Sequence, residues 1–217
     1  MTDTPTTVVR ARTETGDGHH LEGTRRRLSP RQAGVVMQLV QATAEEVEDV
    51  GYTGLTVRNV ARRAGVAPAT AYTYFSSKDH LLAEVLWRRM EALPPVPPAE
   101  RVPVAVRLTD TVRAMVMFTS ESPALVDACT VALLSPNPDV KHLRDRIGLQ
   151  IHRRLAAALG AGVDPLVVRV LETSFMGSLL AAGMGHMPFT DIPEVLAGAA
   201  ELMLGREPVP VDGRAAG

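Results

Sequence analysis

Hydroxyl, phenol and ammonium groups recur between Leu55 and Trp87, at the starts and on the outer faces of short expected helices. The start of a helix presents unpaired backbone N–H groups, and donor side chains beside it can bind phosphate oxygens. These groups are suited to binding a polyanion. The side chains suited to phosphate contacts are Thr56, Tyr72, Tyr74, Ser77 and Lys78.

The elements that position these donors follow a helix-turn-helix pattern. Thr56 can cap a short helix, Gly65 supplies a left-handed turn after it, and Pro68 opens a second short helix. Ser77 can then cap a third, longer helix. Because a helix-turn-helix places its second helix in the major groove of DNA, the segment predicts a DNA-binding head.

An earlier helix is expected to complete this head. It begins at Ser29-Pro30, where Ser is a suitable N-cap and Pro suits the first helical position, and it ends at Gly51. Residues at helical spacing are expected to share one face of this helix, namely Val36, Val40, Thr43, Val47 and Val50. The acidic run in its last turn, which we interpret as a solvated face, consists of Glu45, Glu46, Glu48 and Asp49.

A family resemblance is carried by Thr56, Val60, Ala61, Ala64-Gly65-Val66, Thr70, Tyr72, Tyr74-Phe75, Ser77-Lys78 and Leu81-Leu82. Together these residues resemble the DNA-binding domain of the tetracycline-repressor (TetR) family, over roughly residues 30–90 and without a gap. The resemblance implies that the phosphate-binding side chains anchor a recognition helix that opens at Pro68. It also implies a homodimer with a ligand pocket in the C-terminal half.

Side chains able to read bases are sparse. The resemblance places Arg58 within reach of a base edge, where a guanidinium can pair with guanine through two hydrogen bonds. The helix tip departs from the common family pattern at Pro68 and Ala69, and it offers only methyl contacts. Specificity is therefore expected to depend on Arg58, Thr70, Thr73 and DNA shape. The side chains expected to face bases are Arg58, Ala67, Pro68, Ala69, Thr70 and Thr73.

Several side chains of this region admit a second interpretation. Tyr72 and Tyr74 can be half-buried packing residues whose hydroxyls also bind phosphate. Arg62 and Arg63 fit a solvated face better than specific contacts. The Arg25-Arg26-Arg27 cluster fits either an arm that enters the minor groove or a solvated tail, and both interpretations stay open.

Composition bounds the fold class. The 217 residues are 46% hydrophobic but only 4% aromatic, which favours a helical protein over a sheet protein. The one cysteine excludes an intrachain disulfide and fits a reducing compartment. No apolar run is expected to span a bilayer, so we expect a cytoplasmic protein without a membrane partner.

Charge divides the chain. The net charge is −1, yet residues 51–90 carry six basic and two acidic residues, a net of +4. Residues 91–217 carry eleven basic and fourteen acidic residues, a net of −3. The division fits a half that faces a polyanion and a neutral-to-acidic partner half.

Four segments are expected in an all-α architecture. They are a polar tail (1–28), a three-helix helix-turn-helix head (29–92), a C-terminal helical bundle (99–205) and a second tail (206–217). Prolines 94, 95, 97 and 98 forbid a continuous helix and predict the domain junction. The C-terminal helices are expected at about 99–119, 123–134, 138–159, 165–184 and 191–204.

The C-terminal bundle is expected to supply dimerisation and effector binding. Small residues in the last two long helices allow close approach to a second subunit, although packing within one subunit stays open. The interface candidates are Leu166, Val170, Gly177, Ala181, Leu196 and Leu202. The candidates for a soft, apolar effector pocket and its polar anchors are Arg113, Met117, Phe118, Cys129, His152, Met176 and Leu180. The alternatives are core methionines, surface polar groups and a buried structural thiol.

These features predict a dimeric repressor that a small, apolar ligand releases from a pseudo-palindromic operator in double-stranded DNA. The alternative is an activator or an architectural DNA-binding protein without an effector. An enzyme is disfavoured because no nucleophile–base pairing, phosphate loop or metal cluster stands out. No catalytic residue, cofactor or metal site is predicted.

Overall fold

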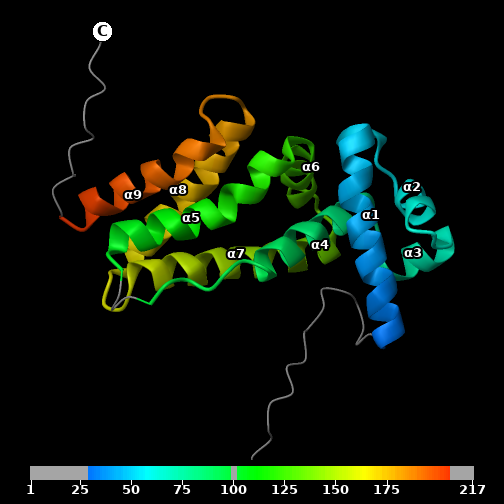
Figure 1. The fold of residues 1–217 in the computed structure, drawn as a ribbon, viewed down its shortest axis with the longest axis horizontal. Helices are drawn as coiled ribbons and strands as arrows, with labels where there is room; N and C mark the ends of the chain where they lie inside the picture. The colour runs from blue at the N-terminus through cyan, green and yellow to red at the C-terminus, as the bar shows by residue number, and fades with distance from the viewer. Residues whose placement is uncertain (1–28, 99–101, 206–217) are drawn as a thin grey trace, which may run out of the picture.

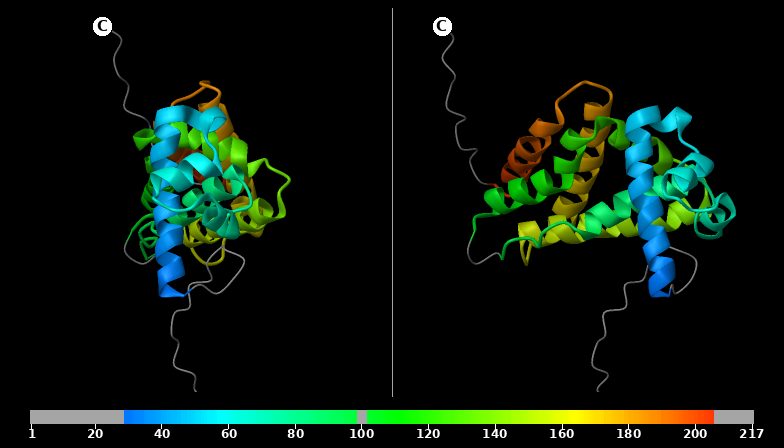
Figure 2. Two further views of the ribbon diagram at one scale, coloured as in Figure 1. Left: turned by 90° about the vertical axis from the view of Figure 1, so that its right-hand side faces the viewer. Right: turned by 45° about the vertical axis from the view of Figure 1, so that its right-hand side comes forward.

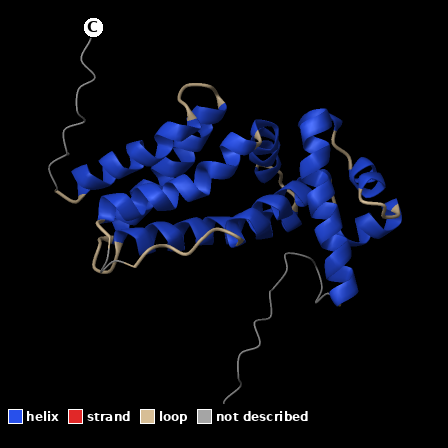
Figure 3. Ribbon diagram, viewed as in Figure 1, coloured by secondary structure: helices blue, strands red, loops and turns tan. Residues whose placement is uncertain are grey.

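The computed structural model describes residues 29–98 and 102–205, and within these ranges every regular element is helical (Figure 3). The all-α fold predicted from composition and periodicity is confirmed. The elements are α1 (Pro30–Gly54), α2 (Val57–Arg63), α3 (Pro68–Tyr74), α4 (Lys78–Glu91), α5 (Val104–Glu121), α6 (Pro123–Leu133), α7 (Pro138–Leu159), α8 (Pro165–Gly183), the 3-10 turn η1 (Phe189–Asp191) and α9 (Ile192–Met203).

The helices of the head begin at the polar residues that the sequence marks as caps. The Ser29 hydroxyl accepts from the backbone N–H of Gln32, and the Gln32 side chain accepts from the backbone N–H of Ser29, which forms a reciprocal capping box before α1. Thr56 caps α2 and Ser77 caps α4 through a side-chain oxygen that accepts a backbone N–H at 3.1 Å in both cases. Local sequence therefore fixes where these helices start.

Two helix boundaries differ from the prediction. Helix α5 begins at Val104 rather than near residue 99. Pro103 precedes it in extended backbone, and proline is suited to this place because it has no N–H to leave unpaired. Helix α1 continues to Gly54, although Gly51 adopts φ 63 and kinks the helix at the predicted end.

Helix α4 joins a head to a body. Helices α1, α2 and α3 lie together at one end of the molecule, and α5 to α9 form the body (Figures 1 and 2). Helix α4 packs against α1 on the head side and against α6 and α7 on the body side. Every residue from His80 to Trp87 is buried. A helix buried all round is a core element, so α4 belongs to the cores of both parts.

Two arginines hold the proline-rich segment between head and body. Arg154 of α7 donates to the carbonyls of Leu93 and Pro94 at 2.9 Å each, and burial lowers the pKa of its guanidinium. Arg107 of α5 donates to the carbonyl of Val102 at 2.5 Å. Both ends of the described linker are thus hydrogen-bonded to body helices. The domain boundaries proposed from sequence stay a prediction.

Helix α8 has a buried and an exposed apolar face. Val168, Leu171 and Phe175 are buried against the body. Contrary to the expectation from sequence, this 19-residue helix alone among the described helices is long and apolar enough to cross a membrane, with 28% of the stretch buried. Its exposed large apolar side chains, together with Met184 directly after the helix, are called the outer face of α8; they are Leu166, Val170, Met176, Leu180 and Met184. Exposed apolar side chains gathered on one helix indicate a contact site.

Candidate nucleic-acid interface

The turn between α2 and α3 sets the direction of the second helix. Gly65 adopts φ 66, and the N–H of Val66 bonds to the carbonyl of Ala61 at 2.9 Å, so the turn closes the end of α2. On the inner side of α3, Ala71 and Phe75 are fully buried. The inner face is therefore fixed in the core, and the opposite face must point outward.

The outer face of α3 consists of the side chains expected to read DNA. Ala67, Pro68, Ala69 and Thr73 are exposed, and Thr70 is half-buried. The Thr73 hydroxyl donates to the carbonyl of Ala69 at 3.1 Å, which leaves its oxygen lone pairs and its methyl group for DNA. The tip of the helix, Ala67-Pro68-Ala69, carries no side-chain hydrogen-bond donor.

The two tyrosines of α3 differ in exposure. Tyr72 is 55% exposed, whereas Tyr74 is half-buried and packs against the core. The Tyr72 hydroxyl is thus free to meet a phosphate outside the head. Tyr74 fits the interpretation in which the ring packs and the hydroxyl lies at the surface.

Lys78 is already engaged at the start of α4. Its ammonium donates to the carbonyl of Tyr52 at 2.7 Å and lies 3.9 Å from the centroid of the Tyr52 ring. The Tyr52 hydroxyl donates to Asp79 at 2.8 Å, and burial followed by this carboxylate raises the Tyr52 pKa. An ammonium has three donors, so Lys78 keeps donors for a phosphate while Tyr52 orients it. The sequence analysis did not identify Tyr52 as a site residue. The one indication in the sequence was that an aromatic side chain directly follows Gly51.

Arg58 and Arg63 have different roles on α2. Arg58 is exposed in the first turn, and no ion pair joins it to another described residue. Arg63 is tied to α1, with its Nε 2.6 Å from Glu46 and a second contact to Asp49. These carboxylates, Glu46 first, raise the Arg63 pKa. Arg63 is therefore a structural cation held by α1, whereas Arg58 stays available for base contacts.

The acidic run of α1 corrects a prediction. It was interpreted as a solvated face, and Glu45, Glu48 and Asp49 are exposed, but Glu46 is buried and binds Arg63. Glu48 accepts a hydrogen bond from the Ser122 hydroxyl at the start of α6. The run joins α1 to α2 on one side and to the body on the other, and these contacts offset its unfavourable place at a helix end.

The polar effector anchors expected in the body lie at its surface. Arg113 of α5 forms ion pairs with Asp110 at 3.4 Å and with Glu194 of α9 at 3.1 Å. His152 of α7 lies 2.5 Å from Glu172 of α8, with about half of its side chain exposed. The pairs Arg113–Glu194 and His152–Glu172 link neighbouring helices at the surface of the body.

The apolar effector candidates are divided between core and surface. Cys129 is buried, and burial raises the pKa of its thiol to about 12. Met176 and Leu180 are 55% and 52% exposed on the outer face of α8, so the expectation that they line an internal pocket is corrected. The expectation for Met117 and Phe118 of α5 concerns side chains outside the described part of the structure.

The dimer candidates fall on both sides of the helices. Leu166, Val170, Gly177 and Leu202 are exposed, and Ala181 is half-buried. The expectation that Leu196 lies in the dimer interface is corrected, because this side chain is 0% exposed and packs within its own chain. Helical periodicity identified the apolar residues but not which of them face the same chain.

A surface recess of about 450 Å³ lies between α4 and α7. The Arg146 guanidinium lies over the Trp87 ring, 4.0 Å from its centroid, and 3.9 Å from Glu91. Neither Cys129 nor Met176, both expected to bind an effector, lines the recess. Its lining residues are Trp87, Glu91, Arg146, Leu149, Gln150 and Arg153.

A buried inner face, a glycine-closed turn and an exposed second helix define a helix-turn-helix protein of the DNA-binding class. The sequence model of the family described as bacterial regulatory proteins, tetR family, matches residues 39–85. An uncharacterized HTH-type transcriptional regulator of Mycobacterium tuberculosis is 41% identical over 185 residues, 81% of this chain and 86% of that relative. The HTH-type transcriptional repressor KstR of Rhodococcus jostii is 30% identical over 180 residues, 77% of this chain and 82% of that relative. The chain belongs to the TetR family of transcriptional regulators.

Solved structures share the fold. A TetR transcriptional regulator from Rhodococcus sp. RHA1 matches with a TM-score of 0.64 at 22% identity, over 82% of this chain and 98% of that chain. The transcriptional regulator FadR from Bacillus subtilis, in complex with stearoyl-CoA, matches with a TM-score of 0.53 at 19% identity, over 77% and 96%. At these identities the likeness concerns the fold alone.

Proposed function

We propose that the protein is a homodimeric repressor whose two α3 helices enter successive major grooves of a pseudo-palindromic operator. The observation that carries this proposal is the exposed face of α3, held outward by the fully buried Ala71 and Phe75. Phosphate contacts come from Thr56, Tyr72, Tyr74, Ser77 and Lys78. Base contacts come from Arg58, Thr73 and the segment 67–70.

The outer face of α8 is the proposed dimer surface. Leu202 of α9, which packs against α8, is also exposed. Gly177 lies in the middle of this face with nothing within 4 Å of its Cβ position, so a partner helix can approach closely. Pairing two such faces removes apolar area from water and brings the two heads into a fixed relation.

A small apolar effector is proposed to release the operator. The support is indirect: the FadR structure carries stearoyl-CoA, and KstR is named a repressor. The body of this chain is rich in apolar side chains, and Met117, Phe118 and Cys129 stay the candidate lining. An effector that prefers the conformation in which the two heads are spaced differently lowers operator affinity. The largest possible loss is set by the difference in effector affinity between the two conformations.

Because its proposed target is chromosomal DNA, we propose that the protein acts in the cytoplasm without a membrane partner. The relatives are transcriptional regulators, so no enzymatic activity is proposed. An activator or an architectural protein would use the same head. The response to small molecules separates the repressor from the architectural protein, because only the repressor has an affinity that an effector controls.

A gel-shift titration with the DNA upstream of the protein's own gene tests this proposal. The expected result is a saturable shift that survives excess random DNA and weakens when stearoyl-CoA is added as the first probe with a long apolar chain. A shift that random DNA removes completely contradicts specific regulation. A specific shift that no member of an acyl-CoA and lipid series affects favours the alternative without an effector.

A further inference from the structure

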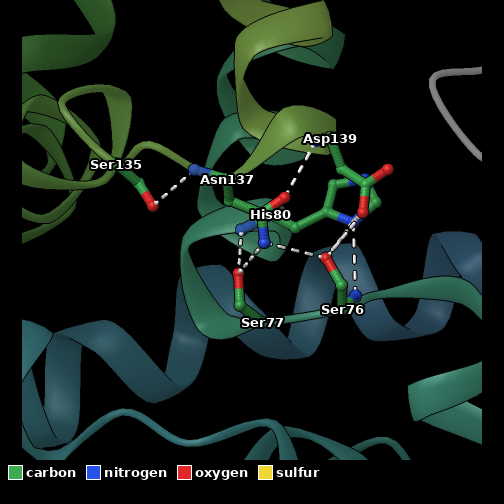
Figure 4. Close-up of polar contacts among 6 residues, drawn as sticks. All are labelled: Ser76, Ser77, His80, Ser135, Asn137 and Asp139. Atoms are coloured by element: carbon green, nitrogen blue, oxygen red, sulfur yellow. Dashed lines mark hydrogen bonds and ion pairs between the residues drawn. The ribbon is translucent and has the colours of Figure 1, made fainter.

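A polar junction joins the corner between α3 and α4 to the start of α7 (Figure 4). The Ser76 hydroxyl donates to Asp139 Oδ2 at 2.7 Å and accepts from Asn137 Nδ2 at 3.1 Å. The same Asn137 amide lies 3.4 Å from the Ser77 hydroxyl. We call Ser76, Ser77, His80, Asn137 and Asp139 the Ser76 junction. It connects residues 59 to 63 positions apart in the sequence, across the boundary between head and body.

His80 connects this junction to the end of the recognition helix. It is fully buried, and its Nδ1 lies 3.3 Å from the backbone N of Ser76 and 3.8 Å from Asp139 Oδ2. Its ring meets Phe75 edge to face, with centroids 5.1 Å apart. Phe75 directly follows α3 and is itself fully buried. A displacement of the junction therefore acts on the last turn of α3 through packed rings.

Asn137 is bound at both ends of its amide. As the N-cap of α7, its Oδ1 accepts from the backbone N–H of Asp139 at 2.8 Å, which leaves its Nδ2 directed at the head. A serine or aspartate here could cap α7 but could not donate to the two serine hydroxyls in this way. Asparagine is thus the residue type that can perform both roles.

We propose that Asn137 and Asp139 are positioning residues for DNA recognition, which hold the α3–α4 corner through Ser76 and so make operator affinity depend on the start of α7. The inference rests on the proposed function. Two heads must meet two half-sites at the same time, so a corner that shifts in either subunit lowers the fraction of dimers with the matching spacing. Ser77 and Lys78, the proposed phosphate contacts, follow Ser76 directly and move with it.

Variants of the junction test this role in the full-length protein. Ser76→Ala leaves the α4 cap intact, and Asn137→Ser leaves the α7 cap intact, so both remove the link without removing a helix start. We expect Ser76→Ala, Asn137→Ser and Asp139→Ala each to weaken operator binding by about three- to tenfold. The Ser76→Ala/Asp139→Ala double variant should lose less affinity than the sum of the two single losses, because each change already removes the hydrogen bond between Ser76 and Asp139.

Two variants of α7 serve as controls. Asp139→Asn keeps an oxygen that accepts from Ser76 and should stay within about twofold of the wild type. Asp145→Ala removes an exposed carboxylate that forms an ion pair with Lys141 of the same helix, and it should leave operator binding unchanged. Melting temperatures measured in parallel separate positioning from loss of fold.

Hydrogen exchange of the backbone amides of residues 75–77 gives a readout that needs no DNA. The proposal predicts faster exchange at this corner in Asp139→Ala and unchanged exchange in Asp145→Ala. Equal operator binding and equal exchange in these two variants would overturn it, as would additive losses in the double variant. If the wild type selects no DNA sequence, the proposed function fails, while the exchange result still decides whether the junction holds the corner.

Discussion

At the residue scale, base preference is expected to depend on few side chains, because segment 67–69 carries no side-chain donor. Arg58 is exposed on α2 and has no described ion-pair partner, whereas Arg63 on the same helix is held by Glu46. Tyr72 offers an exposed hydroxyl beside the recognition face. Base reading and phosphate binding are thus assigned to different residues.

Arg58→Ala is expected to weaken operator binding by about 1–3 kcal/mol and to relax the preference at one base pair. Tyr72→Phe is the matched contrast, because loss of a phosphate contact weakens operator and random DNA about equally. Fluorescence anisotropy with a set of singly substituted operators, at one salt concentration, measures both. Equal losses on operator and random DNA for Arg58→Ala would remove that residue from base recognition.

Cys129 is expected to be chemically inert in the folded protein. Burial raises its pKa from 9.0 to about 12, so the reactive thiolate is scarce at neutral pH. Because the unfolded chain releases this proton near its ordinary pKa, the contribution of Cys129 to stability is complete below about pH 9 and is lost as the pH rises towards about 12.

A colorimetric thiol reagent at pH 8 checks the prediction for Cys129. The unfolded protein should react at once and the folded protein only as fast as it opens. Rapid reaction of the folded protein would contradict the burial of Cys129 that raises its pKa.

Sequence alone could not identify the partners of polar side chains in the head. Helical spacing indicated that Arg63 and the acidic run of α1 are surface residues, and it carried no signal that they meet. The contact between Lys78 and Tyr52 joins residues 26 positions apart and depends on how α1 and α4 pack. Caps were predictable because a cap interacts with backbone only a few residues away.

At the element scale, the angle between α2 and α3 depends on the left-handed conformation of Gly65. Its φ of 66 is a conformation that a residue with a Cβ adopts at a cost, and no atom lies within 4 Å of the Cβ position. The strain of a substitution here is therefore purely conformational.

Gly65→Ala is expected to lower the free energy of unfolding by about 1 kcal/mol. Gly34→Ala is the matched control, since Gly34 lies in helical α1 with the same open surroundings and should stabilise by about 0.5–1 kcal/mol. Chemical denaturation of both variants measures the difference. Equal stability of the two would contradict the strained turn.

The element boundaries also show what a sequence can reveal. The starts of α1, α2, α4 and α8 follow from cap residues and from proline in the first turn. The side of each body helix that faces the core could not be predicted as well. Leu180 and Leu196 each belong to an apolar helical pattern, in α8 and α9 respectively. Leu196 is buried in its own chain, whereas Leu180 is exposed. That distinction depends on tertiary packing.

At the scale of the whole molecule, two heads must be joined by a surface in the body. The outer face of α8 is apolar and exposed, and it lies in the body rather than in the DNA-binding head. Its burial against a second copy would account for exposed leucines and methionines that otherwise cost free energy in water.

Leu180→Glu is expected to convert the dimer into monomers and to weaken operator binding by more than tenfold, about 1.4 kcal/mol or more. Leu134→Glu is the control, because Leu134 is 80% exposed at the end of α6, outside the proposed interface. Sedimentation velocity at micromolar concentration measures the oligomeric state of both variants. A dimer that persists in Leu180→Glu would rule out this face.

The most direct test of the central claim is selection of duplexes from a random-sequence pool by the purified wild-type protein at a fixed salt concentration. We predict enrichment of two inverted half-sites about one helical turn apart, bound by two chains. A pool that stays unenriched, or a single half-site bound by one chain, would contradict the account.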